Sequence, residues 1–222
     1  PDRPAATCVP GLPAVVRSPS EAERARPWQV PIGLHVDTGD PVLLDLSHGH
    51  AVVAGTARAG VSTALESLAA RTGVRSVLVT DRSVGTGPWS VVADPDELAC
   101  HDAEDVLPAW SVPSADGGLL VLVDDAHRLL DDRAGPALDD LLLALAESRP
   151  DVRLVLGGNA DHLGRLFART GVLLRPDPDL HGPLLHTTLE RREDVPPAAG
   201  RGWLVSPDRA TPVHLWVPPG WR

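Results

Sequence analysis

The sequence contains no lysine: all 20 residues counted as Lys or Arg are arginines. No lysine ammonium can therefore contact a phosphate group anywhere in this chain. The sequence also contains no methionine, not even at position 1. We therefore expect it to be a segment of a longer protein.

Long apolar runs are also missing. No stretch reaches the roughly 20 residues that a transmembrane helix needs, and no signal-peptide pattern opens the chain. This segment therefore requires no membrane contact of its own. The two cysteines, Cys8 and Cys100, lack metal-site or redox-motif spacing, which predicts two ordinary thiols in a reducing compartment.

Positive charge is scarce as well, since the formal net charge is −10 and the isoelectric point is about 5.3. A surface that grips DNA needs clustered positive charge to replace the counterions of the phosphates. The longest arginine run is Arg191-Arg192. The composition therefore disfavours DNA as a partner of this segment.

The chain divides at residue 27. Residues 1–27 are rich in proline and read as a linker or N-terminal extension, and residues 28–222 read as one domain. Short apolar runs then alternate with helical patterns, which predicts an α/β fold with a mainly parallel sheet and helices on both faces. Strands are expected at 41–46, 51–54, 75–80, 119–123, 152–156, 172–174, 203–205 and 213–216, and helices at 62–71, 94–110, 136–147 and 161–169.

The glycine-rich loop after the 51–54 strand has the form of a phosphate-binding loop. A P-loop follows a strand, opens a helix and reads Gly, four residues, Gly, Lys, then Ser or Thr. Here the loop reads Gly55, Thr56, Ala57, Arg58, Ala59, Gly60, Val61, Ser62, Thr63. Both glycines and the hydroxyl residue are in place, and they predict ATP binding through backbone N–H groups at the start of the helix.

Valine at the lysine position removes a charge from this loop. The lysine ammonium neutralises phosphate charge, most strongly in the transition state. Val61 therefore predicts weak or absent hydrolysis, and whether the chain is an enzyme stays open. Arg58 offers a possible replacement cation from within the loop. A strand, glycine turn and helix without any ligand is the other interpretation of the same pattern.

A second candidate site follows the most apolar strand. Residues 119–123 run into Asp124-Asp125, the pattern of a Walker B motif. We expect Asp124 to hold Mg²⁺ together with Ser62, and Asp125 to orient or deprotonate the attacking water. Asn159 follows the next strand and is a candidate sensor of the γ-phosphate. Helix capping is the alternative interpretation, both for an aspartate of the pair and for Asn159.

These residues together resemble the FtsK/SpoIIIE family of RecA-like P-loop ATPases. The similarity rests on the segments 30–34, 41–46 and 49–55 before the loop, on the aspartate pair, and on the closing segments 200–205 and 211–215. The aspartate-rich Walker B is similar to that of the type VII secretion ATPases EccC and EssC. Members of that group carry several such domains in tandem, the later ones often degenerate.

The resemblance implies a function that composition alone does not. It implies a degenerate ATP-binding module with a regulatory or substrate-docking role in protein secretion. Its partners would be neighbouring ATPase domains of the same chain or ring and a secreted protein's signal peptide. Its place would be the cytoplasmic part of a membrane-anchored protein. A DNA-translocating motor domain, and a peptide-binding module that no longer binds nucleotide, remain the alternatives.

Overall fold

The computed structural model describes residues 16–17, 28–110, 118–132, 135–148, 150–163, 168–191 and 198–217. Most of the expected N-terminal extension, 1–27, lies outside these ranges, as does Cys8. Within the extension, β1 (Val16–Arg17) pairs in parallel with the last strand of the chain. Cys100 is an exposed free thiol.

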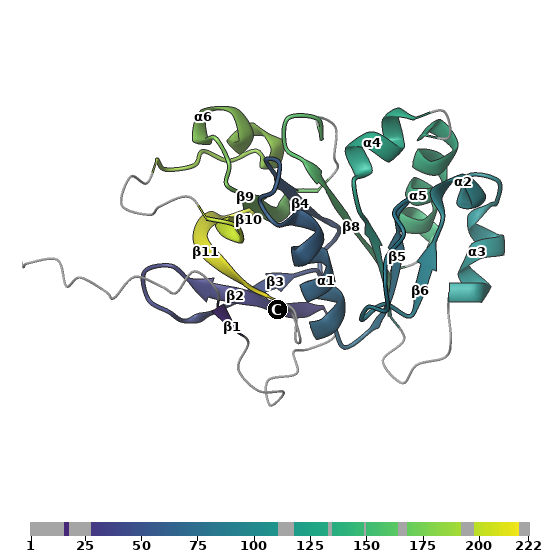
Figure 1. Ribbon diagram of the computed structural model, residues 1–222, viewed down its shortest axis with the longest axis horizontal. Helices are drawn as coiled ribbons and strands as arrows, with labels where there is room; N and C mark the ends of the chain where they lie inside the picture. The colour runs from purple at the N-terminus through teal and green to yellow at the C-terminus, as the bar shows by residue number, and fades with distance from the viewer. Residues whose placement is uncertain are drawn as a thin grey trace, which may run out of the picture.

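A single mixed sheet connects the described strands in the order β3-β2-β11-β10-β9-β4-β8-β7-β5-β6 (Figure 1). The half from β9 to β6 is parallel and the half from β3 to β10 is antiparallel, which confirms the expected mainly parallel sheet and the closing strand pair. The parallel half consists of β4 (Ala51–Gly55), β5 (Arg75–Val79), β6 (Val91–Ala93), β7 (Leu119–Val123), β8 (Val152–Asn159) and β9 (Thr170–Leu174). The antiparallel half consists of β2 (Gln29–His35), β3 (Pro41–Asp45), β10 (Arg201–Ser206) and β11 (Arg209–Val217).

Helices cover both faces of the parallel strands (Figure 1). On one face lies α1 (Val61–Arg71), which contacts β2, β4, β8 and β11. The other face carries α3 (Ala103–Trp110), α4 (Ala126–Asp131) and α5 (Gly135–Ser148). The short α2 (Pro95–Leu98), α6 (Pro178–His181) and the 3₁₀ turn Gly182–Leu185 complete the described helices.

The side chains of the central strands alternate between two apolar cores. In β7, Leu119, Val121 and Val123 pack on the side of α5, while Leu120 and Leu122 pack on the side of α1. All five residues of β7 are buried, as are all five of β4. A strand buried on both faces needs apolar residues at every position, which explains why these runs do not alternate with polar residues.

The expected helix over 94–110 is wrong in one respect, because the structure divides it into α2 and α3. Asp94 caps α2 by accepting from the N–H groups of Asp96 and Glu97. The Asp102 carbonyl then accepts from Val106 N and begins α3. Leu98 and Val106 are both buried, and their spacing of eight suits one continuous helix equally well, so periodicity did not reveal the break.

Further elements differ from the sequence-based expectation. The expected strand 152–156 continues to Asn159, because its last residues remain paired with β4 up to Gly55. The strand β2 and the short edge strand β6 were not anticipated. For the expected helix 161–169, residues 164–167 lie outside the described ranges. None of the helices in the described ranges combines the length and apolarity that crossing a bilayer requires.

Candidate functional site

The loop of residues 55–63 rises from the centre of the parallel sheet. Gly55, its first residue, pairs with Asn159 of β8 on one side and with Leu174 of β9 on the other. A Cβ atom at Gly55 would lie 2.9 Å from the Leu174 carbonyl oxygen, so a larger residue does not fit. Gly60 has φ 102°, a left-handed conformation that glycine adopts at little cost. Both glycines of the motif are therefore required by the backbone.

The start of α1 leaves its N–H groups available to an anion. Its N-cap residue is Gly60, so no side chain caps the helix. The first internal bond runs from Ala64 N to the Gly60 carbonyl, at 2.9 Å. Within the described part of the chain, the N–H groups of residues 61–63 donate to no acceptor. Unsatisfied N–H groups at a helix N-terminus attract phosphate through hydrogen bonding and the helix dipole.

The carbonyl groups of the loop are held from outside. Ala160 N donates to the Gly55 carbonyl at 3.1 Å, and Gly200 N donates to the Ala59 carbonyl at 2.9 Å. The segments after β8 and before β10 therefore fix the loop, while the N–H groups of residues 61–63 stay unpaired among the described residues. The loop has the shape of an anion cradle.

No contact among the described residues directs a cationic side chain of the loop into this cradle. Val61 is half-buried and packs towards β8, where a Cβ atom at Gly157 would lie 3.1 Å from Val61 Cγ1. Arg58 is exposed, with φ 61°, and forms no ion pair with the described residues. The structure thus gives Arg58 no contact that supports the role of a replacement cation.

The acidic edge, Asp124 and Asp125 at the end of β7, lies against the start of α1. Ser62 Oγ donates to Asp124 Oδ1 at 3.1 Å, so the two expected metal-site residues are in direct contact. The Asp124 side chain is buried, and Asp124 Oδ1 also accepts from Asp125 N at 3.1 Å. Burial raises the pKa of Asp124, and the negative charge of Asp125 adds to this, while the Ser62 hydrogen bond acts in the opposite direction.

Asp125 precedes α4 but does not cap it. Its backbone is left-handed, with φ 53°, and its side chain accepts no bond from the N–H groups of α4. Its carboxylate forms an ion pair with Arg82 instead. The capping interpretation therefore does not account for the second aspartate.

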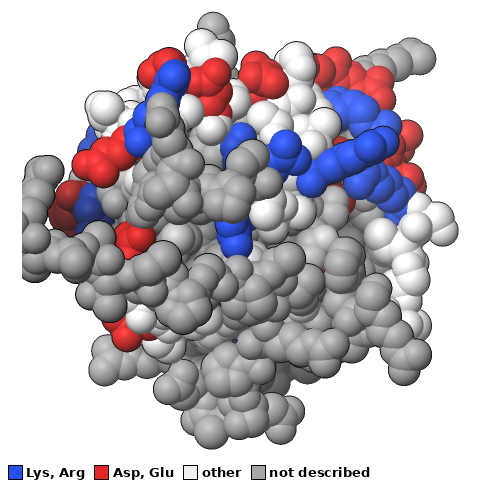
Figure 2. All heavy atoms as spheres, turned by 60° about the vertical axis from the view of Figure 1, so that its left-hand side comes forward, with Lys and Arg blue, Asp and Glu red and all other residues white. Residues whose placement is uncertain are grey.

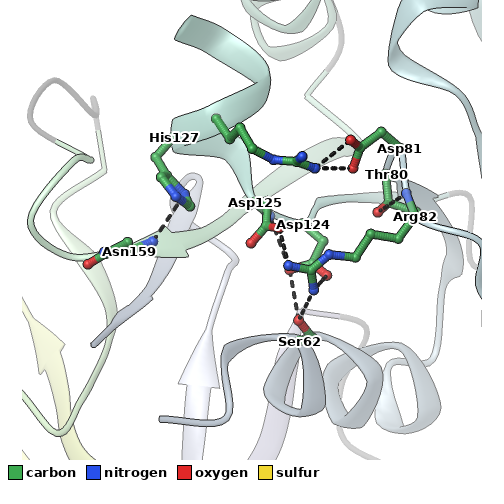
Figure 3. Close-up of polar contacts among 9 residues, drawn as sticks. Ser62, Thr80, Asp81, Arg82, Asp124, Asp125, His127 and Asn159 are labelled. Carbon is green, nitrogen blue, oxygen red and sulfur yellow. Dashed lines mark hydrogen bonds and ion pairs between the residues drawn. The ribbon is translucent and has the colours of Figure 1, made fainter. Parts of the chain in front are cut away.

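Arg82 is a site residue that the sequence patterns did not indicate. It follows β5, the neighbour of β7 in the sheet, and its guanidinium contacts Ser62, Asp124 and Asp125 together (Figure 3). The signal in the sequence was a basic residue just beyond the carboxyl end of an apolar strand. That signal becomes informative only once β5 and β7 are known to be adjacent.

Asn159 lies at the end of β8, apart from the Ser62–Asp124 contact (Figure 3). Its Oδ1 accepts from Asp161 N at 3.1 Å, a local turn bond of the kind that a capping asparagine makes. Its backbone N–H donates to His127 Nδ1 at 3.2 Å. The structure does not join the Asn159 side chain to the acidic edge, and its role as a γ-phosphate sensor stays a prediction.

The donor set suits a hard cation but not a metal site made by the protein alone. Hydroxyl and carboxylate oxygens are the ligands that Mg²⁺ prefers. In the described ranges, no group of three or more His, Cys, Asp or Glu residues is arranged to hold a metal ion. A metal held by Ser62 and Asp124 would therefore complete its shell with water and phosphate oxygens.

The charged surface is mixed. Figure 2 shows arginine side chains in a row across the upper part of one face, with carboxylates on both sides of the row. The arginines that are visible therefore lie among acidic neighbours.

Comparison with known proteins gives a result for structure only. No family model matches the chain, and no curated protein matches its sequence. Among solved structures, the fold is similar to the cytoplasmic domain of the Thermomonospora curvata type VII secretion ATPase EccC, with a TM-score of 0.65 and 21% identity. It is also similar to ATPases 2 and 3 of the same EccC in complex with a signal sequence peptide, with a TM-score of 0.66 and 18% identity. Both comparisons cover 93% of this chain but only 28% and 44% of the EccC chains.

A conjugation protein has the same fold. The coupling protein TcpA of pCW3, solved with ATPγS, matches with a TM-score of 0.65 and 14% identity over 93% of this chain and 70% of its own. At these identities the likeness establishes the architecture alone. The chain has the fold of the P-loop ATPase domains found in EccC and TcpA, which confirms the RecA-like fold that its sequence predicts.

Proposed function

We propose that this chain is a nucleotide-binding module of an FtsK/SpoIIIE-type translocase in which hydrolysis of ATP is slow. The observation that carries the proposal is the uncapped start of α1, whose free N–H groups lie beside Ser62 and the acidic edge. The nucleotide-bound TcpA structure, which shares the fold, supports ATP as the ligand.

Each part of the site has its own role. The N–H groups of the 55–63 loop bind the phosphates, and Ser62 and Asp124 hold the magnesium that accompanies ATP. That ion would neutralise phosphate charge as the bond to the leaving group breaks. Asp125 is placed to orient a water molecule. Because position 61 is a valine, which carries no charge, the cradle lacks the ammonium that accelerates phosphoryl transfer.

The setting we propose is protein secretion. The EccC fragment with this fold was solved with a signal sequence peptide, and the net charge of −10 opposes a DNA-gripping role. The module would act beside neighbouring ATPase domains on the cytoplasmic side of a membrane-anchored assembly. Its contribution there would be regulation or docking of a substrate's signal, not motor force.

The test is a thermal unfolding experiment with ATP and Mg²⁺, run in parallel with an assay of phosphate release. A ligand at a hundred times its Kd stabilises the folded state by about 2.7 kcal/mol, so the melting temperature rises. We expect this rise together with slow turnover. An unchanged melting curve at millimolar ATP, with and without Mg²⁺, would contradict nucleotide binding. Fast turnover by the isolated chain would contradict the role assigned to Val61.

A further inference from the structure

The hydrogen bonds at the acidic edge already occupy the oxygen atoms that a metal ion would need. The Ser62 hydroxyl has one hydrogen, which it donates to Asp124, and its oxygen accepts from Arg82 Nη1 at 3.4 Å. Arg82 Nη1 lies 3.5 Å from Asp124 Oδ2, and its Nη2 pairs with Asp125 Oδ2. A single guanidinium therefore touches all three of the side chains that face this position.

We propose that Arg82 is the resident cation of this site and competes with Mg²⁺ for it, so that the metal enters only after Arg82 leaves Asp124 and Asp125. The inference rests on the proposed function for the identity of the site, and it adds the element that controls metal entry. A guanidinium and a divalent ion a few ångströms apart repel each other, and the repulsion is stronger at the buried Asp124 carboxylate than in open water, so the two cations compete for these oxygens.

The backbone holds Arg82 in this position. Arg82 N donates to Thr80 Oγ1 at 3.2 Å, and the buried Thr80 is itself fixed through its N–H to the Ala93 carbonyl at 3.1 Å. Asp81, the intervening residue, pairs with Arg128 of α4. The turn after β5 is thus attached to β6 and to α4. The bonds through Thr80 anchor the main chain of Arg82 beside the acidic edge, and they do not involve Arg128, so they remain when Arg128 is replaced.

The arrangement also compensates charge without a metal. Asp124 is buried and Asp125 largely so, and together they bring two negative charges to the edge. A buried carboxylate without a partner is costly, and Arg82 supplies the partner. The free energy lost when Arg82 leaves the aspartates must be recovered from the contacts of Mg²⁺ and of the phosphates. We therefore expect Mg²⁺ alone to bind weakly at this site.

The chain offers a matched control for a test. Arg128 also pairs with a carboxylate, and the side chains of Arg82 and Arg128 are 50% and 52% exposed. The contacts of Arg128 in the described ranges leave out Ser62, Asp124 and Asp125. Arg82→Gln and Arg128→Gln thus remove the same charge from neighbouring positions, and only the first opens the metal position. Arg82→Lys keeps the charge but replaces the guanidinium fork.

The experiment measures binding of Mn²⁺ to the protein without nucleotide, by electron paramagnetic resonance, and then binding of a fluorescent ATP analogue in Mg²⁺ and in EDTA. We expect Arg82→Gln to bind Mn²⁺ on the order of tenfold more tightly than wild type, since one charge-assisted contact no longer competes. Arg128→Gln should stay near wild type, and Arg82→Lys should lie between Arg82→Gln and wild type. With the analogue, Arg82→Gln should gain affinity in Mg²⁺ and not in EDTA.

Two outcomes would overturn the inference. If Arg82→Gln and Arg128→Gln tighten Mn²⁺ binding equally, the effect is general electrostatics and not competition for the site. If Arg82→Gln weakens binding of the analogue in EDTA, Arg82 is a phosphate ligand and not a competitor of the metal. The Mn²⁺ measurement needs no nucleotide, so the proposed function can fail while the inference on Arg82 holds.

Discussion

The 55–63 loop and the acidic edge lie one hydrogen bond apart, from Ser62 to Asp124, yet they carry charge in different ways. The loop offers the partial positive charge of backbone N–H groups, and its one arginine, Arg58, is exposed without an ion pair among the described residues. At the acidic edge, two aspartates and an arginine bring full charges that neutralise one another in part. A fold of this class ordinarily places a lysine on the loop side. Here the side-chain cation stands on the acidic side.

The largest effect we expect comes from giving the loop a cation. In Val61→Lys, the ammonium should stabilise charge on the transferring phosphoryl group and raise turnover by about a hundredfold, on the order of 3 kcal/mol in transition-state free energy. Phosphate release under saturating ATP and Mg²⁺ measures the change. The matched control is Val61→Leu, which lengthens the side chain without charge and should leave turnover low.

This substitution also tests the comparison itself. If Val61→Lys raises turnover, the missing cation on the loop side of the site limits catalysis. If turnover stays at the wild-type level while the variant remains folded, the missing charge on the loop is not what makes hydrolysis slow.

The next effect concerns the backbone of the loop. Gly60→Ala places a side chain in a left-handed conformation, φ 102°, at a cost of about 1–2 kcal/mol in the free energy of unfolding. Gly39, in the turn between β2 and β3, has φ 75° and has no atom within 4 Å of where its Cβ would lie. Gly39→Ala should therefore destabilise the protein by a similar amount. Urea unfolding of both variants gives the two values.

Only one member of this pair should alter ligand binding. We expect Gly60→Ala to weaken binding of an ATP analogue, because strain at residue 60 is relieved by moving the N–H groups of the cradle. Gly39→Ala should bind as wild type does. Equal affinities for the two variants would show that the geometry of the loop does not determine phosphate binding.

The smallest effect is a pH dependence at the acidic edge. Burial raises the pKa of Asp124 in the folded state, so its protonated form favours folding. Its contribution to stability is fully present below the unfolded-state pKa of about 3.9 and is lost as pH rises through the folded-state pKa. Asp124→Asn cannot ionise, so its stability relative to wild type should rise as the pH increases from about 4.

Urea unfolding at a series of pH values measures this difference, and Asp125→Asn serves as the control that keeps the buried carboxylate. A relative stability of Asp124→Asn that falls with increasing pH would show that the Ser62 and Arg82 contacts outweigh burial at Asp124. The folded protein without ligand would then be more stable with Asp124 ionised than with Asp124 protonated.

Several features of the site follow from the order of residues alone. The glycines Gly55 and Gly60, the hydroxyl of Ser62 and the aspartate pair are local patterns, because each depends on the geometry of a strand end or of a helix start. The apolar runs of β4 and β7 indicated a sheet buried on both faces, since the strands carry apolar residues at every position. Such signals are independent of which strands become neighbours in the sheet.

Other features depend on contacts that form only in the folded chain. The division of residues 94–110 into α2 and α3 follows from capping at Asp94 and a restart at Asp102, and the hydrophobic spacing was compatible with either arrangement. The sequence left Asn159 as either a γ-phosphate sensor or a helix cap, and in the fold its side chain bonds to the next turn. Local hydrogen bonds fix both arrangements, and the sensor role of Asn159 stays a prediction.

The sequence by itself determined the P-loop architecture, the absence of lysine and the pairing of a glycine loop with an acidic strand end. Only the tertiary structure decided which cation meets those acids. The order of strands in the sheet is set by packing between residues far apart in the chain, and it places β5 beside β7. That placement brings Arg82 to Asp124 and Asp125, whereas Arg58, within the loop itself, is exposed to solvent.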